Sequence, residues 1–515
     1  MSVRFSVVIP TRERAETLRF ALRTCLEQSF DDYEIVVSDN FSSPATRAVV
    51  EEAASPRVRY VRTSEPVAMS TSWEFAVSHA RGEYVTLIGD DDGLLPHALG
   101  ELDRVARETG TKAIRWDPAF YTWPNVSLPG QGNYLRVPFG CAMAERDGRA
   151  AIREVIAFRE FYTALPMLYN SAVHRDVLAD LRRLTGRVFP HPIPDVYSGF
   201  AIAHAAGRYI STTVPMSVSG QSGASNGVAT LFNRGRNAID AEFHALNARD
   251  GLRSEPTVPD LPAFPHVVVA DSFAFAKRTL FPDLAADIDR RALSVACVVG
   301  SRVAEADWPA ALATVREALA DLPEEQAWFD AELAATPFRA PPAVQMRPSR
   351  LGFDGTYLHL DAAAFGVIDV AAAARLCEQL LNYRDQPVPY SPEDDRHVAA
   401  MKIAELAFVC DERERAILWL HLTSSELLQS THALRQSQSE LRQSQSELLQ
   451  SRSELLAAVN RLQGTCEERE QIIRRVGAQS RDLDQRLREE RRWSLKRPFR
   501  VAKRLLSLGA ARAPK

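Results

Sequence analysis

Short apolar runs alternate with amphipathic helical patterns over roughly the first 110 residues, and this alternation is the feature that most constrains the fold. Between the runs, apolar residues recur at the spacing of one helix face, as in residues 18–26 and 73–80. Because parallel strands need a crossover between them, we predict an α/β fold with a mainly parallel sheet and helices on both faces. The runs that predict strands are 5–9, 33–37, 58–61 and 84–88.

The composition is that of an ordinary folded protein. The chain has 515 residues, of which 46% are hydrophobic and 25% charged, so extensive disorder and a collagen-like repeat are excluded. The six cysteines are scattered without a Cys-x-x-Cys pair, and no secretory leader precedes them. No run reaches the roughly 18 uncharged apolar residues of a membrane-spanning helix. We therefore expect a cytoplasmic protein of two or three domains.

Charge is distributed unevenly along the chain. The formal net charge of −4 excludes a general basic surface, so we expect no nucleic-acid partner. Residues 491–515, however, contain nine Lys or Arg and no Asp or Glu, interspersed with apolar side chains. This combination suits an anionic membrane surface, which predicts peripheral contact with the inner face of the plasma membrane. A solvated chain end is the alternative.

From residue 427, leucine recurs at every seventh position as far as residue 462. Residues 434–440 and 441–447 are the same heptad, Leu-Arg-Gln-Ser-Gln-Ser-Glu. This period predicts a coiled coil over residues 423–490, and a homo-oligomer formed through it. The a positions of its first half are polar, which specifies register but weakens the assembly, so a single solvated helix is the alternative.

These patterns divide the chain into four segments. Residues 1–235 form the α/β domain, because the mixed pattern after residue 110 completes it. Residues 255–422 are alanine-rich and carry no motif that indicates chemistry, so we predict a mainly helical domain of unassigned role. Residues 423–490 are the coiled coil, and residues 491–515 are a basic amphipathic tail.

Acidic residues follow two of the predicted strands. Asp39 comes after the second strand, and Asp90–Asp92 come after the fourth. Ligands of open parallel sheets collect beyond the carboxyl ends of the strands. No Lys or Arg lies between Glu83 and Asp103 to neutralise the triplet, so we expect Mg²⁺ or Mn²⁺ together with a substrate diphosphate. The alternatives are a helix cap for Asp39 and a solvated acidic turn for the triplet.

Several segments together resemble the nucleotide-sugar domain of the family 2 inverting glycosyltransferases, which have the GT-A fold. The resemblance covers about residues 4–110. It implies a nucleotide-diphosphate sugar as donor, Mn²⁺ or Mg²⁺ as cofactor, and an Asp39 that accepts a hydrogen bond from the nucleotide base. The pocket around that base is implied to be lined by Pro10, Thr11 and Arg14. The matching segments are 5–11 (FSVVIPT), 28–30 (QSF), 34–40 (EIVVSDN) and 80–96 (ARGEYVTLIGDDDGLLP).

The acidic triplet occupies the D-x-D region of that family. The resemblance implies that Asp90 and Asp91 bind the nucleotide sugar and that Asp92 binds the metal. Two positions depart from the commonest pattern. Gly89 stands where the first aspartate of the motif is frequent, and Trp73-Glu74 stands where Arg-Asn is frequent.

The same resemblance places an acidic pair on the acceptor side, ahead of a helix that ends in Ala-Gly-aromatic. Counting back 13 residues from Gly207 reaches Pro194 and Asp195, so only the second acidic member is present. Asp195 is thereby implied to be the general base that takes the proton of the acceptor hydroxyl. Its alternative role is the N-cap of the helix that follows, and both roles are compatible.

Three further features are less informative. Residues 217–227 are small, polar and glycine-rich, and either close over a diphosphate through backbone N–H groups or form a plain surface loop. We expect His97 on a helix surface and Cys25 in the core. The histidines lack the spacing of a zinc site.

Together these features predict a glycosyltransferase. It would move a sugar, with inversion and with a divalent metal, from a nucleotide-diphosphate donor to a hydroxyl of a cell-surface glycan or lipid-linked saccharide. One alternative is a non-catalytic coiled-coil scaffold built on a degenerate transferase domain. The other is a sugar nucleotidyltransferase, which usually has a glycine-rich loop after the first strand, whereas residues 10–13 (PTRE) contain no glycine.

Overall fold

The structure is a computed structural model, and it describes part of the chain. The chain divides into two units, Met1–Asp411 and Glu412–Lys515. The predicted basic tail lies outside the described residues, and so does the predicted coiled coil, apart from four helical positions. The described residues are 3–223, 238–254, 257–258, 265–301, 303–340, 346–348, 351–381, Arg475, Gln485, Arg486 and Arg488.

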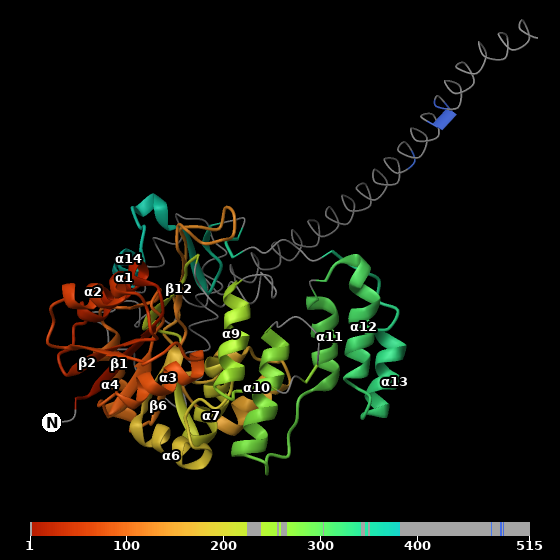
Figure 1. The fold of residues 1–515 in the computed structure, drawn as a ribbon, viewed down its shortest axis with the longest axis horizontal. Coiled ribbons are helices and arrows are strands. Elements are labelled where there is room, and N and C mark those ends of the chain that lie inside the picture. The colour runs from red at the N-terminus through yellow and green to blue at the C-terminus, as the bar shows by residue number, and fades with distance from the viewer. Residues whose placement is uncertain are drawn as a thin grey trace, which may run out of the picture. The chain divides into compact units, whose positions relative to one another are not determined.

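The first unit contains an eight-stranded sheet with the strand order β3-β2-β1-β4-β10-β6-β11-β9. β1, β2 and β6 of this sheet are labelled in Figure 1. β1 (Phe5–Thr11) lies between β2 (Tyr33–Asp39) and β4 (Tyr84–Leu87) and runs parallel to both. β3 (Val58–Arg62) is parallel to β2, so all four predicted strands and the mainly parallel sheet are confirmed. Two strands run against their neighbours, β10 and β9. The remaining strands of this sheet are β6 (Ala113–Trp116), β9 (Met143–Asp147), β10 (Ser171–His174) and β11 (Arg208–Thr212).

Helices cover both faces of this sheet, as predicted. Val7 and Ile9 of β1 lie in one apolar core with side chains of α1 and α4, whereas Val8 lies in the other core with side chains of α3 and α7. This alternation follows from the two-residue period of a strand. Cys25 of α1 is fully buried in the first core, which confirms its prediction. The helices between the strands are α1 (Ala15–Leu26), α2 (Pro44–Glu52), α3 (Met69–Ser78), α4 (Ala98–Thr109), α5 (Gly148–Ile156), α6 (Arg175–Thr185) and α7 (Pro194–Ala206).

A second, six-stranded sheet has the order β13-β14-β8-β7-β12-β5 and was not predicted. Most of its pairs are antiparallel. Residues 217–221 belong to it as a strand, so the prediction of a loop is wrong there, because this segment pairs with β7 and β5. Residues 224–227 lie outside the described residues. The strands are β5 (Gly93–Leu94), β7 (Ala119–Thr122), β8 (Tyr134–Pro138), β12 (Ser217–Gln221), β13 (Gly352–Phe353) and β14 (Tyr357–Asp361).

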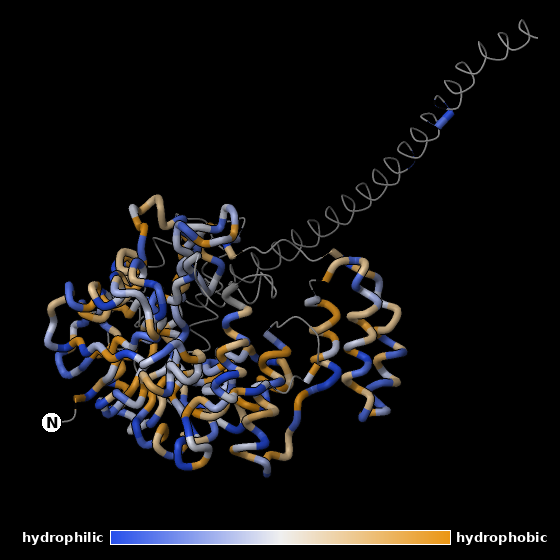
Figure 2. The backbone as a smooth tube through the Cα atoms, in the orientation of Figure 1, coloured by the Kyte–Doolittle hydropathy of each residue, from blue (hydrophilic) through white to orange (hydrophobic). Residues whose placement is uncertain are grey.

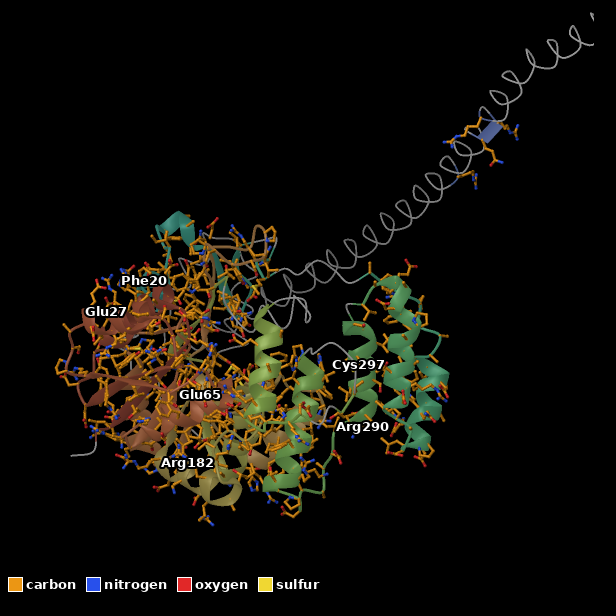
Figure 3. All side chains as sticks on the ribbon, viewed as in Figure 1. Phe20, Glu27, Glu65, Arg182, Arg290 and Cys297 are labelled. Carbon is orange, nitrogen blue, oxygen red and sulfur yellow. The ribbon has the colours of Figure 1, made fainter. Side chains whose placement is uncertain are left out.

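The described part of residues 255–422 is helical as expected, but it also completes the second sheet. β14 pairs with β8, and Phe20 of α1 packs against the core that contains α14. Glu27, labelled with Phe20 in Figure 3, accepts hydrogen bonds from Arg375 of α14. The helices after α7 are α9 (Ala238–Arg249), α10 (Pro265–Leu280), α11 (Arg290–Gly300), α12 (Trp308–Glu317), α13 (Pro323–Glu332) and α14 (Val370–Leu381).

His97 is not on a helix surface, so that prediction is wrong. It occupies the N-cap position of α4, and its side chain is only 10% exposed because Glu378 of α14 covers it. The distance between His97 Nδ1 and Glu378 Oε2 is 2.5 Å. A contact with a helix almost 300 positions further along the chain has no signature in the local sequence.

Hydropathy alternates along the described helices (Figure 2). Within the part of the chain that the structure describes, no helix combines the length and the apolar character needed to cross a bilayer.

Candidate active site

The carboxyl ends of β1 and β4 bring three of the predicted residues into contact. Thr11 Oγ1 donates a hydrogen bond to Asp90 Oδ2 over 2.6 Å, and Arg14 Nη1 donates to Asp90 Oδ1 over 3.0 Å. Pro10 lies one position earlier on β1, opposite Ser38 of β2. Burial lowers the pKa of Arg14, but the charges of Asp90 and Asp91 more than offset this, so its guanidinium stays charged.

Asp39 lies directly beside Thr11 in the parallel pair of β1 and β2 and is fully buried. Its Oδ1 accepts the backbone N–H of Ser42 over 2.8 Å, and its Oδ2 accepts the hydroxyl of Tyr60 over 2.5 Å. Arg62 Nε lies 3.6 Å from the same Oδ2. The N-cap residue of α2 is Ser43, so Asp39 does not cap that helix. These contacts hold a carboxylate at the strand ends where the sequence predicts base recognition.

The acidic triplet is buried rather than solvated, which rules out the alternative of a solvated turn. Asp90, Asp91 and Asp92 are 3%, 4% and 2% exposed. Burial, and next the charge of Asp91, raise the pKa of Asp92 to about 7. Carboxylates that are enclosed and repel one another create a site that favours a cation.

Both oxygens of Asp92 accept backbone N–H groups. Oδ2 accepts from Gly89 and Oδ1 accepts from Gly220 of β12, each over 2.7 Å. The hydroxyl of Tyr169 is also hydrogen-bonded to this carboxylate. Asp92, predicted to be the metal ligand, is therefore engaged by the protein on both oxygens.

Only one of the two carboxylate oxygens of Asp91 accepts hydrogen bonds from the described residues. Its Oδ2 accepts from Ser222 Oγ over 2.7 Å and from Ser222 N over 3.2 Å, while its backbone oxygen accepts from Trp123 Nε1 over 2.9 Å. Among the described residues, none donates a hydrogen bond to Asp91 Oδ1. Burial raises the pKa of Asp91, and Arg14 opposes that effect. Asp91 Oδ1 is thus the open carboxylate oxygen of the triplet.

Gly89 has a steric reason to lack a side chain. A Cβ at this position would lie 2.9 Å from Asp92 Oδ2, 3.3 Å from Asp91 Oδ1 and 3.2 Å from the Tyr169 hydroxyl. The absence of a side chain therefore leaves space where these three oxygens converge.

Hard oxygen donors of this kind fit Mg²⁺ or Mn²⁺. Within the described residues, no group of three or more His, Cys, Asp or Glu side chains is placed to hold a metal ion. Mg²⁺ commonly takes only one or two carboxylates from the protein and completes its shell with water and substrate phosphates. One open oxygen at Asp91, with Asp92 beside it, is compatible with that mode of binding.

Tyr169 and Trp73 belong to the site, although sequence reasoning gave neither of them a role. Tyr169 lies on the 3₁₀ helix η2 (Leu168–Asn170), and its ring stacks on Trp73 with centroids 6.2 Å apart and planes 3° apart. Burial raises the pKa of Tyr169 well above its ordinary value, as do the charges of Asp92, Asp91 and Asp195, so the phenol stays neutral. Tyr169 is therefore within electrostatic reach of the triplet and of Asp195. Its local sequence has no motif, and only the tertiary fold brings it here.

Asp195 lies in the first turn of α7, whose N-cap residue is Ile193, so the N-cap alternative is wrong. Its Oδ1 is enclosed and has no hydrogen-bond partner among the described residues. Burial is the main cause that raises the pKa of this carboxyl group. An unpartnered carboxylate oxygen with raised proton affinity has the properties of a general base.

The solved structures to which the chain is similar share little sequence with it. S. aureus TarS 1-349 in complex with UDP-GlcNAc is 15% identical, with a TM-score of 0.39, over 63% of this chain and 82% of that one. Mannosyltransferase PcManGT from Pyrobaculum calidifontis in complex with GDP-Man and Mn²⁺ is 17% identical, with a TM-score of 0.35, over 82% and 89% of the two chains.

Comparison with protein sequences finds a relative of higher identity. A GalNAc(5)-diNAcBac-PP-undecaprenol beta-1,3-glucosyltransferase of Campylobacter jejuni is 34% identical over 108 residues, which are 20% of this chain and 35% of that protein. The chain thus spans about a third of that relative's length. Residues 6–136 match the family model described as Glycosyl transferase family 2. The N-terminal part of the chain therefore carries a glycosyl transferase family 2 domain, with the GT-A-like α/β fold that the sequence predicts.

Proposed function

We propose that the protein is a metal-dependent, inverting glycosyltransferase that moves a sugar from a nucleotide-diphosphate donor to a hydroxyl of a cell-surface glycan or lipid-linked saccharide. One observation carries this proposal: the carboxyl ends of β1 and β4 bring Thr11 and Arg14 onto Asp90, in a buried acidic triplet. The name of the Campylobacter relative describes a lipid-linked acceptor, which supports this acceptor class.

On the donor side, Asp39 binds the base of the nucleotide and Asp90 binds its ribose. Asp39 lies at the end of β2, where Tyr60 and Arg62 hold its carboxylate in place. A carboxylate in this position accepts an N–H of the base. Thr11 and Arg14 fix Asp90, and the buried charge of Arg14 adds attraction for the diphosphate.

Asp91 Oδ1 is the proposed metal ligand, and Asp92 lies beside it as the carboxylate that backbone N–H groups fix in place. When bound, Mg²⁺ or Mn²⁺ would supply positive charge next to the diphosphate oxygens. Arg14 and the N–H groups around the triplet orient the carboxylates before substrate arrives, so little reorganisation is needed.

Asp195 accepts the proton of the acceptor hydroxyl. As that oxygen forms a bond to the anomeric carbon, the bond between this carbon and the diphosphate oxygen breaks, and the diphosphate leaves with the electron pair. The attack comes from the face opposite the leaving group, which inverts the anomeric configuration. Burial of Asp195 raises its proton affinity and so favours proton transfer near neutral pH.

Calorimetry tests the donor side. The full chain is titrated with UDP, GDP, dTDP and CDP, each with and without Mn²⁺, and one nucleotide is expected to bind only with the metal. Asp91→Asn should abolish this binding. Asp103→Asn is the matched control, because Asp103 is a buried aspartate on α4 that pairs with Arg4 away from the site. Absence of heat with all four nucleotides would overturn the proposal.

Product analysis separates the alternatives. A glycosyltransferase releases a nucleoside diphosphate, whereas a nucleotidyltransferase releases or consumes pyrophosphate. Asp195→Asn should keep metal-dependent donor binding but lose transfer. A scaffold would release neither product with any donor.

The assembly proposed from the sequence concerns residues beyond the described part of the fold. We propose a homo-oligomer through residues 423–490 and peripheral membrane contact through residues 491–515. Sedimentation of the full chain tests the first. Flotation with phosphatidylglycerol vesicles tests the second, and exchanging the nine basic residues of the tail for glutamine should abolish it.

A further inference from the structure

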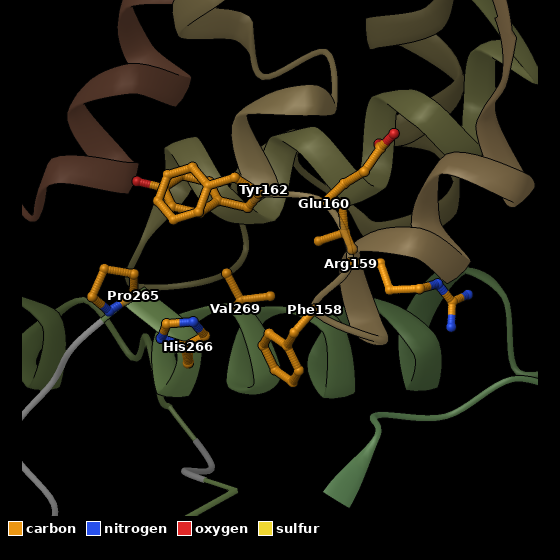
Figure 4. A pocket seen from close by; sticks show the side chains of 9 residues that line it. Phe158, Arg159, Glu160, Tyr162, Pro265, His266 and Val269 are labelled. Carbon is orange, nitrogen blue, oxygen red and sulfur yellow. The ribbon is translucent and has the colours of Figure 1, made fainter. Parts of the chain in front are cut away.

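A pocket of about 110 Å³ lies at the end of α5 and the start of α10 (Figure 4). Ring side chains dominate its wall: Phe158, Phe161 and Tyr162 come from the segment after α5, and Pro265 and His266 begin α10. None of these residues belongs to a motif of the sequence. Sites for small molecules commonly combine such apolar walls with a few polar groups.

The rings are arranged in two close pairs. The centroids of Phe161 and Tyr162 are 4.5 Å apart, and those of Phe158 and His266 are 5.3 Å apart. Phe158 has a φ of +54°, a left-handed conformation that is unfavourable for a bulky side chain. Phe161 is 53% exposed. Phe161 is thus an exposed aromatic side chain beside the partly buried rings of Phe158 and Tyr162, which pack against the core.

The charged residues at this pocket are neutralised. Arg159 forms two hydrogen bonds to Glu154, over 2.7 and 2.8 Å, and Arg146 forms two to Glu160, over 3.0 and 2.8 Å. Burial lowers the pKa of His266, so its imidazole is neutral at neutral pH. A charged ligand would therefore gain little here, whereas an uncharged ligand with an apolar face and hydroxyl groups fits the wall.

The segment that forms the pocket is tied to Asp195. Tyr162 begins the 3₁₀ helix η1 (Tyr162–Ala164), and the chain continues from there into Leu168. Leu168 N donates to Ser198 Oγ over 3.2 Å, and Ser198 Oγ donates to the backbone oxygen of Asp195 over 2.7 Å. After burial, the charge of Asp195 is the further cause that raises the pKa of Tyr162. Tyr162 of the pocket is therefore within electrostatic reach of Asp195, the proposed base.

We propose that this pocket binds an uncharged pyranose ring of the saccharide acceptor, stacked on the rings of Phe161 and Tyr162. One face of a pyranose carries mainly C–H groups, whose positive edges suit the negative face of an aromatic ring. The proposal rests on the proposed function, because a glycosyl acceptor is what brings a saccharide to Asp195.

Saturation-transfer NMR with the full chain tests this directly. The probes are the methyl glycosides of glucose, galactose, mannose and N-acetylglucosamine. At least one of these glycosides should bind. Phe161→Ala should weaken its binding about three- to tenfold, which is the affinity expected to be lost with one aromatic contact. Phe365→Ala is the matched control, because Phe365 is 56% exposed and lies in the 3₁₀ helix η4 (Ala362–Phe365). It should change binding less than twofold.

Two results would overturn the proposal: none of the four glycosides binds, or the two variants weaken binding equally. Sedimentation can give a third such result. If Phe161→Ala alone loses self-association, the pocket is a contact between copies of the chain.

Donor hydrolysis in water distinguishes failure of the pocket proposal from failure of the proposed function. If wild type and Phe161→Ala hydrolyse donor equally while glycoside binding does not respond to the variant, only the pocket proposal fails. If glycosides bind but no donor is hydrolysed, the proposed function fails.

Discussion

The backbone N–H of Gly220 donates to Asp92 Oδ1 over 2.7 Å, across 128 positions of sequence. β12 of the second sheet thereby holds the acidic triplet that follows β4 of the first. A Cβ at position 220 would lie 1.8 Å from the backbone oxygen of Asp91 and 2.9 Å from Trp123 Nε1. The close approach of the two backbones requires glycine at this position.

Gly220→Ala should therefore destabilise the protein by about 1–3 kcal/mol, since backbone atoms must move to relieve the overlap. Urea unfolding measures the change, and metal-dependent nucleotide binding should weaken with it. Gly100→Ala is the control, because a Cβ there has no atom within 4 Å and α4 gains helix propensity. Equal stability of the two variants would contradict the packing described above.

Asp92→Asn should be less stable than Asp91→Asn by about 1–3 kcal/mol. Each variant replaces a carboxyl group with a neutral amide of the same shape, so the difference reports hydrogen bonding. An amide has one acceptor oxygen, which leaves either the Gly89 or the Gly220 N–H facing an NH₂ group. At position 91, the amide oxygen replaces Oδ2 as acceptor from Ser222, and the NH₂ group takes the open place. Urea unfolding at one pH decides between these outcomes.

The metal-free protein should lose stability as the pH rises from about 4 through about 7. Burial raises the pKa of Asp92 from 3.8 to about 7, so the folded state binds this proton more tightly than the unfolded chain does. The free energy of unfolding, measured in EDTA at pH 5.5 and 8, should be larger at pH 5.5. In Asp92→Asn this difference should shrink. An unchanged difference in the variant would assign the pH dependence to other groups.

Asp195→Asn should lower kcat by about 10²–10⁴-fold and leave donor binding intact, because the amide cannot accept the proton. For wild type, kcat/KM should rise with pH and level off above the raised pKa of this carboxyl group. The acidic limb of the profile is therefore expected above the ordinary value of about 3.9 for aspartate. A limb at the ordinary value would argue against Asp195 as the base.

Glu378→Ala and His97→Ala should each destabilise the fold by about 1–3 kcal/mol, because both side chains are about one-tenth exposed and each variant removes one partner of their direct contact. Arg375→Ala on the same helix is the control. Its pair with Glu27 is 41% and 34% exposed, so its loss should cost less than about 1 kcal/mol. Thermal unfolding of the three variants is the measurement.

The sequence by itself determined the parallel half of the first sheet and the residues at its carboxyl edge. Apolar periodicity is local, so β1 to β4 and their helices could be predicted from short windows. The direction of each strand then places Thr11, Asp39 and Asp90 at one edge. Their contacts, such as the hydrogen bond from Thr11 to Asp90, follow from that placement.

Only the tertiary structure decided what those groups can do. Which oxygen of the triplet stays open depends on Gly220 and Ser222, which reach Asp91 and Asp92 from a sheet without a local signature. Tyr169, the pocket beside Tyr162 and the burial of His97 likewise depend on segments far apart in sequence. Proton affinity and ligand space are set by what surrounds a side chain, and in this chain those surroundings come from remote residues.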